Sequence, residues 1–198
     1  MTINLDDWGL KPAFTTTKTK GRLGRVISHI SQFYTVVTEG GVITAQVQGR
    51  LKFRATTKLE LPTVGDWVDV VGKTESDWRI ASILPRETLL KRKVVGDKSA
   101  SQPLASNIDK VLIMSGLDHN FNISRLERFL TLVFDSGASP VLILNKLDKC
   151  DDLESIKKEL SVLNGTCPFY FTSALSGDGV DLLDEILLPQ EAVVIIGS

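Results

Sequence analysis

The first half of the chain alternates between hydrophobic and polar residues over short runs that are rich in β-branched and aromatic side chains. A period of two is typical of β-strands that bury one face. Turn-forming residues separate the runs, as at Glu39-Gly40-Gly41 and between Pro62 and Asp66. The predicted strands are Gly21–Ile30, Phe33–Thr38, Val42–Val47, Trp67–Val71 and Trp78–Leu84. Short strands at this spacing favour a small barrel, with the OB-fold as the leading candidate.

The alternation ends after Pro85. Residues 86–106 begin with the basic run Lys91-Arg92-Lys93 and continue with Gly96, Pro103 and several serines. Polar residues interrupted by glycine and proline are typical of connecting segments. This stretch is therefore predicted to be a polar linker.

From residue 107 the hydrophobic period changes, and runs of Val, Ile and Leu alternate with amphipathic segments. Strands are predicted at Ile108–Met114, Val141–Leu144, Phe169–Phe171 and Ala192–Ile196, and helices at Arg125–Phe134, Asp151–Leu163 and Val180–Leu187. For the first helix, Ser124 and Glu127 have capping-box spacing and Gly137 is a stop signal. The alternation of strands and helices predicts a parallel α/β sheet covered by helices on both faces.

Charge divides the chain in the same way. The 198 residues have a net charge of -1, but residues 1–100 carry 16 Lys and Arg against 10 Asp and Glu, whereas residues 101–198 carry 7 against 14. A basic half joined to an acidic half indicates two domains with different partners. Ordinary variation over one surface would give the same totals, so charge alone leaves both interpretations open.

Several classes of protein are disfavoured by the sequence. No apolar run approaches the roughly 20 residues that span a bilayer. The first ten residues contain Asp6 and Asp7 and lack the apolar core of a secretion signal. Two cysteines, Cys150 and Cys167, suit neither a disulfide framework nor a zinc site without further ligands. We therefore expect a cytoplasmic protein with no membrane segment and no metal ligands in this chain.

Polar residues follow two of the predicted strands directly. Asn145-Lys146-Leu147-Asp148 comes after the apolar run Val141–Leu144, and Thr172-Ser173-Ala174 comes after Phe169–Phe171. In an open parallel sheet, ligands bind beyond the carboxyl ends of the strands. Both loops are therefore expected to line one site.

The residue types in these loops suit guanine. The Asp148 carboxylate can accept two parallel hydrogen bonds from the ring N–H and the exocyclic amino group, a donor pair that adenine lacks. An unpaired carboxylate facing adenine would cost roughly 1–3 kcal/mol. The Lys146 stem can cover the base plane, and Asn145 can connect the loops. The backbone N–H of Ala174 can donate to the guanine carbonyl, while Ser173 orders its loop.

A GTPase also needs a glycine-rich loop with a lysine to hold phosphates. Gly72-Lys73-Thr74 imitates the end of such a loop, but Trp67 stands where its first glycine belongs, so this match is rejected. The remaining candidate is the last predicted strand, which ends at Gly197-Ser198. Guanine motifs that precede the phosphate loop predict a circularly permuted domain, cut off where that loop begins.

With this order of motifs, the chain resembles the RsgA (YjeQ) family of GTPases that depend on the small ribosomal subunit. The similarity runs from about Gly21 to Ser198. The segments that carry it are Leu61–Val68 (LPTVGDWV), Ile83–Arg86 (ILPR), Leu89–Arg92 (LLKR), Asn107–Ile113 (NIDKVLI), Phe121–Leu130 (FNISRLERFL) and Asn145–Asp148 (NKLD).

The resemblance implies three regions: an OB-fold that binds RNA or the ribosome over residues 1–85, a linker over 86–106, and the first part of a circularly permuted P-loop GTPase domain over 107–198. It also implies hydrolysis of GTP to GDP and phosphate during late maturation of the small (30S) subunit, with 16S rRNA as a partner. Mg²⁺, and a C-terminal domain that binds Zn²⁺, are implied only for the intact parent. We expect a monomer.

The residues that the resemblance assigns to nucleotide binding are Asn145, Lys146, Leu147, Asp148, Ser173 and Ala174, with Gly197 and Ser198 as the start of the phosphate loop. No catalytic residue of the family matches a position in this chain, so the chain itself is expected to bind GTP very weakly and not to hydrolyse it.

The alternative is an OB-fold module that binds rRNA without enzymatic activity. Its basis is a basic cluster comprising Lys18, Lys20, Arg22, Arg25, Arg50, Lys52, Arg54 and Lys58, together with aromatic residues that include Phe33, Tyr34 and Phe53. Such residues can neutralise phosphates and stack on bases, although solvated charges and core aromatics fit the same sequence.

Overall fold

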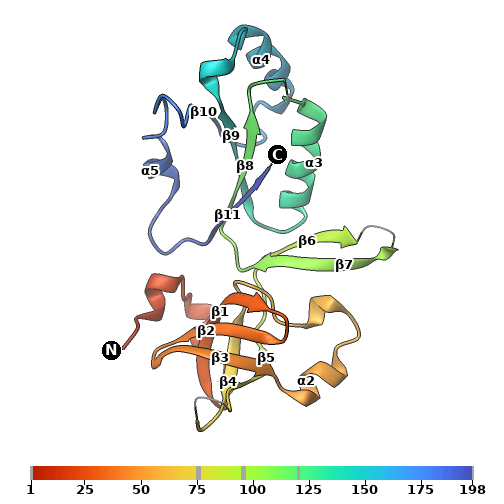
Figure 1. Ribbon diagram of the computed structural model, residues 1–198, viewed down its shortest axis with the longest axis vertical. Helices are drawn as coiled ribbons and strands as arrows, with labels where there is room; N and C mark the ends of the chain where they lie inside the picture. Colours follow the sequence, from red (N-terminus) through yellow and green to blue (C-terminus); the bar gives the residue numbers. More distant parts are fainter. Residues whose placement is uncertain (1, 75–76, 95–96, 120, 198) are drawn as a thin grey trace. The chain divides into compact units, whose positions relative to one another are not determined.

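The computed structural model describes residues 2–74, 77–94, 97–119 and 121–197. The chain divides into two compact units, Met1–Ile108 and Asp109–Ser198, called here the barrel unit and the sheet unit. Figure 1 shows the elements of each unit along the chain. None of the helices in the described ranges has the length and apolar character needed to cross a membrane.

The barrel unit contains a closed five-stranded barrel with the strand order β1-β2-β3-β5-β4. Its strands are β1 (Arg22–Ile30), β2 (Phe33–Thr38), β3 (Gly41–Val47), β4 (Trp67–Val71) and β5 (Arg79–Ile83). Neighbouring strands are antiparallel except β3 and β5, which pair in parallel. All five predicted strands are confirmed, and closure into a barrel confirms the OB-fold.

Two groups of apolar side chains fill the barrel unit. Val26, Val36, Val70 and Ile80 are fully buried in one group, as alternation along β1, β2, β4 and β5 requires. The other group lies beneath the N-terminal segment, which forms η1 (Leu5–Trp8) and α1 (Pro12–Thr15). From these two turns, Leu5 and Phe14 pack on buried Trp67 and so cover the barrel core. Two further short elements, α2 (Gly49–Arg54) and η2 (Lys58–Glu60), connect β3 to β4.

Where a polar linker was predicted, the chain forms a two-stranded antiparallel sheet of β6 (Leu89–Val94) and β7 (Asp97–Ser106). Leu90 pairs with Ala105, and both are buried. The composition of residues 86–106 misled the prediction because backbone hydrogen bonds form this ladder regardless of side-chain polarity. Pro103 is accommodated beside a register shift between Leu90 and Lys91.

A buried ion pair joins the turn before β4 to the segment between β5 and β6. Asp66 is fully buried, and its two carboxylate oxygens accept hydrogen bonds from Nε and Nη2 of Arg86, each at 2.7 Å. The same carboxylate accepts from Ser106 Oγ at 2.5 Å and from the Thr63 backbone N–H at 2.8 Å. Gly65 has φ +92° and lies so close to Ser106 that a Cβ would come within 2.0 Å of its carbonyl oxygen. The turn at residues 63–66 is therefore fitted closely to the end of β7.

The sheet unit is built on four parallel strands in the order β10-β9-β8-β11. These are β8 (Lys110–Gly116), β9 (Ser139–Asn145), β10 (Phe169–Phe171) and β11 (Val193–Gly197). Their apolar composition follows from burial on both faces: Val111, Ile113, Leu142 and Leu144 are almost completely buried, and so are their alternating neighbours Leu112 and Ile143.

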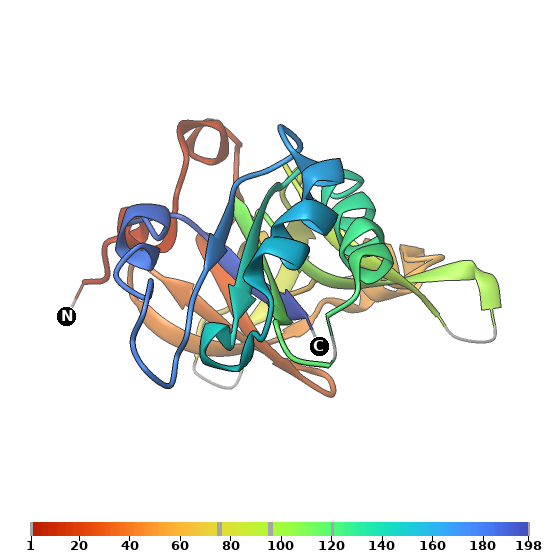
Figure 2. The same cartoon turned by 90° about the horizontal axis from the view of Figure 1, so that it is seen from above.

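Helices cover both faces of this sheet, as predicted. The helix α3 (Ile123–Phe134) packs on β8 and β9, whereas Ile186 of α5 (Leu183–Ile186) packs with Leu112 and Ile143 on the other face. Figure 2 shows the sheet between these two helices. The remaining helical turns are η3 (Leu147–Lys149), α4 (Leu153–Leu160) and η4 (Ser161–Leu163).

Two helix boundaries differ from the prediction. The N-cap of α3 is Asn122, whose side chain accepts a hydrogen bond from the Arg125 N–H at 2.9 Å, so Ser124 lies inside the helix and no capping box forms. Asparagine is at least as good an N-cap as serine, and its position two residues earlier extends the helix. The helix expected over Val180–Leu187 is a single turn, α5, because the chain from Gly177 folds through turns before it.

The Asp66–Arg86 pair gives a test of the barrel unit. Asp66→Ala leaves the Arg86 guanidinium, whose side chain is 14% exposed, without its carboxylate. Loss of one partner of a buried pair costs about 3–5 kcal/mol. We expect urea unfolding to report a loss of that size. Glu154→Ala, which removes a solvent-exposed pair with Lys157, is the control and should change stability by under about 1 kcal/mol. Equal losses in the two variants would contradict this role for Asp66.

Candidate functional site

The two polar loops predicted to share a site do lie together. Phe171, the last residue of β10, pairs in parallel with Leu144, and Asn145 ends β9 one residue later. Because both strands run in the same direction, their carboxyl ends reach the same edge of the sheet. The Leu147 N–H then donates to the Thr172 carbonyl at 3.0 Å, which joins the loops through their backbones.

Asn145 connects the loops through its side chain. Its Oδ1 accepts hydrogen bonds from the Ala174 backbone N–H at 3.0 Å and from Thr172 Oγ1 at 3.3 Å. Its backbone carbonyl also accepts from the Leu117 N–H at 2.8 Å, which adds the end of β8 to the same edge. Asn145 is therefore half-buried at the point where three chain segments meet.

Lys146 has a left-handed backbone conformation, with φ +68°, that non-glycine residues seldom adopt. A conformation of this kind costs on the order of 1 kcal/mol and is maintained by its surroundings. Here the Lys146 Nζ forms an ion pair with Asp118 at 2.6 Å, and the two side chains are 45% and 18% exposed. Beneath the pair lies Gly116, where a Cβ would come within 2.9 Å of Asp118 Oδ1.

Sequence reasoning missed Asp118. The available signal was its position two residues after the carboxyl end of β8, close to the edge at which Asn145 ends β9. No motif marked it, and only the sheet order shows that β8 lies beside β9.

Asp148 faces the second loop. Its Oδ1 accepts a hydrogen bond from Ser173 Oγ at 2.5 Å, and the same Ser173 oxygen accepts from the Ser176 N–H at 3.2 Å. Ser173 is completely buried, whereas Asp148 is exposed. Among the described residues, no side chain or N–H donates to Asp148 Oδ2. A rigid serine thus orients the carboxylate, and part of its hydrogen-bonding capacity faces solvent.

The backbone N–H of Ala174, predicted to donate to a guanine carbonyl, donates to Asn145 in this structure. Gly197 ends β11 at the same edge of the sheet, paired with Met114 of β8. A Cβ at Gly197 would come within 2.1 Å of the Met114 carbonyl oxygen, and its φ is +154°. Ser198, the other residue predicted to begin the phosphate loop, lies outside the described residues.

Elsewhere in the described parts of the chain, titratable groups form no comparable cluster. Within the described residues no group of three or more His, Cys, Asp and Glu side chains is arranged to hold a metal ion. Cys150 and Cys167 are both free and half-buried, and burial raises the pKa of the Cys167 thiol.

The largest change to the predicted basic cluster concerns Arg25. It is 8% exposed, lies over the Trp67 ring and donates to the carbonyls of Trp8 and Asn107. Its guanidinium therefore stabilises the barrel unit from within, where an RNA phosphate cannot reach it.

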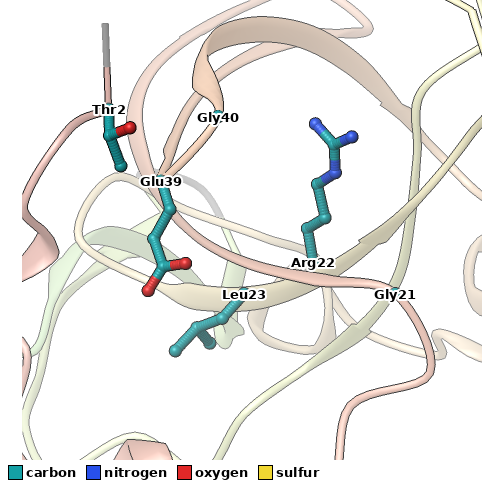
Figure 3. Close-up of a pocket in the computed structure, with 6 residues that line it drawn as sticks. All are labelled: Thr2, Gly21, Arg22, Leu23, Glu39 and Gly40. Atoms are coloured by element: carbon teal, nitrogen blue, oxygen red, sulfur yellow. The ribbon is translucent and has the colours of Figure 1, made fainter.

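Arg22 lines a hollow of about 510 Å³ on the barrel (Figure 3). Its guanidinium lies near Gly40, where a Cβ would come within 2.8 Å of Nη1, and 4.9 Å from the centre of the Trp78 ring. Glu39 is the one acidic residue in this lining. The hollow combines one cation and one carboxylate with apolar and backbone surface, so it contains no catalytic group of residues.

Comparison with known proteins extends these observations. The model of the RsgA GTPase family matches residues 83–198, and that of the RsgA N-terminal domain matches residues 23–77. The small ribosomal subunit biogenesis GTPase RsgA 2 of Lactiplantibacillus plantarum is 37% identical over 100% of this chain and 57% of its own length. RsgA of Syntrophotalea carbinolica is 39% identical over 88% of this chain and 50% of its own. The chain spans about half the length of these curated relatives.

Two solved structures have the same fold. YjeQ from Thermotoga maritima matches with a TM-score of 0.71 and 24% identity, and YloQ, described as a circularly permuted GTPase, matches with a TM-score of 0.64 and 20% identity. Each alignment covers 89% of this chain and 60% of the solved one. The fold therefore places this chain in the class of proteins that have an OB-fold barrel followed by a circularly permuted P-loop GTPase domain, of which the chain contains part. The chain belongs to the RsgA GTPase family, which confirms the resemblance found in the sequence.

The connection made by Asn145 can be tested without a ligand. Asn145→Ala removes the acceptor for the Ala174 N–H, and loss of a bond worth about 1 kcal/mol predicts roughly fivefold faster amide hydrogen exchange at Ala174. The Ser173 N–H, which donates to the Asp178 carbonyl within the same loop, is the internal control and should be unaffected. Unchanged exchange at Ala174 would show that Asn145 does not hold the loop.

Proposed function

We propose that this chain reads guanine through the loops after β9 and β10 and, as part of a whole RsgA GTPase, contributes to the hydrolysis of GTP to GDP and phosphate. Asp148 binds the ring N–H and the amino group of the base, with Ser173 orienting its carboxylate. Lys146 covers the base plane with its stem. The loops that surround the base are shaped by Asn145, Leu147 and Ala174.

The observation that carries this proposal is the short hydrogen bond from buried Ser173 to Asp148, between two loops that are 25 residues apart in sequence. It leaves a carboxylate of fixed orientation at the ligand-binding edge of a parallel sheet. A guanine base offers two parallel donors to such a carboxylate, which adenine and the pyrimidines do not.

The strand order supports a phosphate site at Gly197. The chain leaves β8 toward β9 on one side, and β11 returns to the other side of β8, so the order reverses between β8 and β11. Ligands of open α/β sheets bind at such a reversal. Strands are roughly 4.8 Å apart, so β11 lies about 10 Å from β9. This separation suits a nucleotide whose base contacts the β9 loop and whose phosphates contact the residues from Gly197 onward, with Mg²⁺ on the phosphates.

The proposed partner is the small (30S) ribosomal subunit with its 16S rRNA, contacted by the OB-fold barrel of residues 1–85 during late maturation in the cytoplasm. Membership of the RsgA family and the excess of basic residues in the first half of the chain support this. The proposed oligomeric state of the chain is a monomer. A module that binds rRNA without enzymatic activity is the second candidate, favoured by the exposed cations of the barrel unit.

Base selectivity distinguishes a guanine site from other uses of these loops. Asp148→Asn replaces one acceptor with a donor, so it should weaken GDP binding by roughly 5- to 100-fold, as expected for about 1–3 kcal/mol. The same change should strengthen binding of xanthosine diphosphate, whose second ring carbonyl accepts from the new amide. Protein-observed NMR titrations with GDP, xanthosine diphosphate and ADP measure this. Asp152→Asn, at the N-cap of α4, is the control and should leave the selectivity unchanged. Equal affinity for GDP and ADP in the unmodified chain would exclude guanine reading.

Phosphate contacts provide a large part of the binding energy for nucleoside triphosphates, and the base contacts proposed for this chain supply only the remainder. We expect the 198-residue chain to bind GTP and GDP very weakly and to show no GTP hydrolysis. Isothermal titration calorimetry and a phosphate-release assay test both points. Micromolar affinity for GTP would contradict this expectation while leaving the assignment of the base contacts intact.

A further inference from the structure

The helix α2 presents an aromatic side chain to solvent. Phe53 is 91% exposed, the highest value for a large hydrophobic residue among the residues that the structure describes. Burial of a phenylalanine ring is favourable, and here that free energy is not used within the chain. Single exposed apolar residues are common on soluble proteins, so the surroundings of Phe53 decide whether it has a role.

Those surroundings are basic. Arg50, Lys52 and Arg54 are all exposed, and α2 contains no acidic residue. Within the described part of the chain none of these three cations forms an ion pair. These residues and Phe53 are called here the α2 surface. Its charge is therefore available to an anionic partner.

The helix is fixed to the barrel on its opposite side. Leu51 packs against the barrel core, and the N–H of Gln48, the N-cap of α2, donates to the Ile80 carbonyl of β5 at 2.9 Å. Successive residues on a helix are about 100° apart, so Phe53 projects roughly opposite Leu51. Arg50, three residues earlier, lies on the same side as Phe53. A rigid support thus holds the ring and its neighbouring cations toward solvent.

The nearest carboxylate along the chain does not neutralise this surface. Glu60 accepts hydrogen bonds from the Thr56 N–H, the Thr56 hydroxyl and the Thr57 hydroxyl. The backbone bond from Thr56, followed by its hydroxyl bond, lowers the pKa of Glu60. The Glu60 carboxylate therefore accepts hydrogen bonds that close the turn after α2, and it forms no ion pair with the cations of the α2 surface among the described residues.

A second aromatic surface lies beside α2. Lys52 lines a hollow of about 480 Å³ together with His29 and Tyr34, whose rings stack with centroids 4.2 Å apart and planes 4° from parallel. His29 is exposed, whereas Tyr34 is 4% exposed beneath it. One exposed ring, that of His29 on β1, thus lies in the same hollow as the Lys52 cation of α2.

We propose that the α2 surface binds single-stranded RNA, with a base stacked on Phe53 and phosphates neutralised by Arg50, Lys52 and Arg54. This rests on the proposed contact of the barrel with rRNA and names the part of the barrel that makes it. A single strand alternates flat apolar bases with anionic phosphates, and the α2 surface offers a ring among cations in the same way. One apolar side chain is too little to insert into a membrane, and a protein partner would have to be acidic and offer an apolar pocket as well.

The test uses the full chain and a fluorescent single-stranded RNA of about 12 nucleotides, a length within the range that one OB-fold covers. Phe53→Ala should weaken binding by roughly 5- to 100-fold, since stacking contributes about 1–3 kcal/mol per base, and should leave the salt dependence unchanged. Replacement of Arg50, Lys52 and Arg54 by alanine should instead make the plot of log affinity against log salt less steep. Each lost phosphate contact lowers the steepness by about 0.7, so the three together lower it by about 2.

Phe53→Trp keeps an aromatic ring, so it should retain the affinity, and its added fluorescence should be quenched when a base stacks on it. Val42→Ala changes another exposed apolar residue of the barrel, 57% exposed on β3, and should have no effect. The pair Lys157→Ala and Lys158→Ala on α4 is the control for charge lost away from the α2 surface and should change the slope little. Unfolding curves that match the unmodified protein show that each variant is folded.

The outcomes separate this proposal from the one on which it depends. If the unmodified chain binds no RNA even at low salt, both fail. If it binds RNA and Phe53→Ala binds equally well, rRNA contact stands and the assignment to α2 is wrong. If Phe53→Ala weakens binding of an acidic peptide as much as that of RNA, the surface recognises protein and the proposal is also overturned.

Discussion

Parallel pairing of β8, β9 and β10 is the constraint on which the candidate site depends. Strands that run in one direction end at one edge, and their register sets which loop residues meet there. Asn145 ends β9 opposite Gly116 of β8, and the loop after β10 begins one residue beyond the Phe171–Leu144 pair. Residues 29 positions apart, Asn145 and Ala174, can then share a hydrogen bond. A shift of the register by one residue would point these side chains to the opposite face.

Within that frame, polar contacts orient the site before any ligand binds. Ser173 directs the Asp148 carboxylate, and the ion pair with Asp118 holds the Lys146 ammonium group in place. Groups that are already oriented lose less conformational entropy on binding, so the same contacts contribute more to affinity. The hydrogen bond from Ala174 to Asn145 has the opposite effect on the proposed guanine site, because the Ala174 N–H is already used and would have to leave Asn145 to donate to a guanine carbonyl.

The barrel unit is organised by a different interaction. Burial of Asp66 is tolerated because the Arg86 fork, Ser106 and Thr63 satisfy its oxygens, and these partners come from the barrel, from the segment after β5 and from β7. These contacts attach Arg86 before β6 and Ser106 at the end of β7 to the barrel, although the composition of this part of the chain is typical of a linker. Arg25 and Arg86 use their charge inside the unit, whereas the cations of α2 remain exposed. In the sequence, the buried arginines and the exposed cations contribute equally to the positive charge of residues 1–100.

Local sequence determined the strands of the barrel and of the parallel sheet, most of the helices and the two loops that carry Asp148 and Ser173, because hydrophobic period and turn residues act over a few positions. It also determined the family, through several long segments in a fixed order. Tertiary structure alone decided the burial of Arg25, the contact of Ser106 with Asp66 and the position of Asp118 beside Lys146. Each of these depends on which distant segments become neighbours, and a residue's charge or polarity does not specify its partner until the chain has folded.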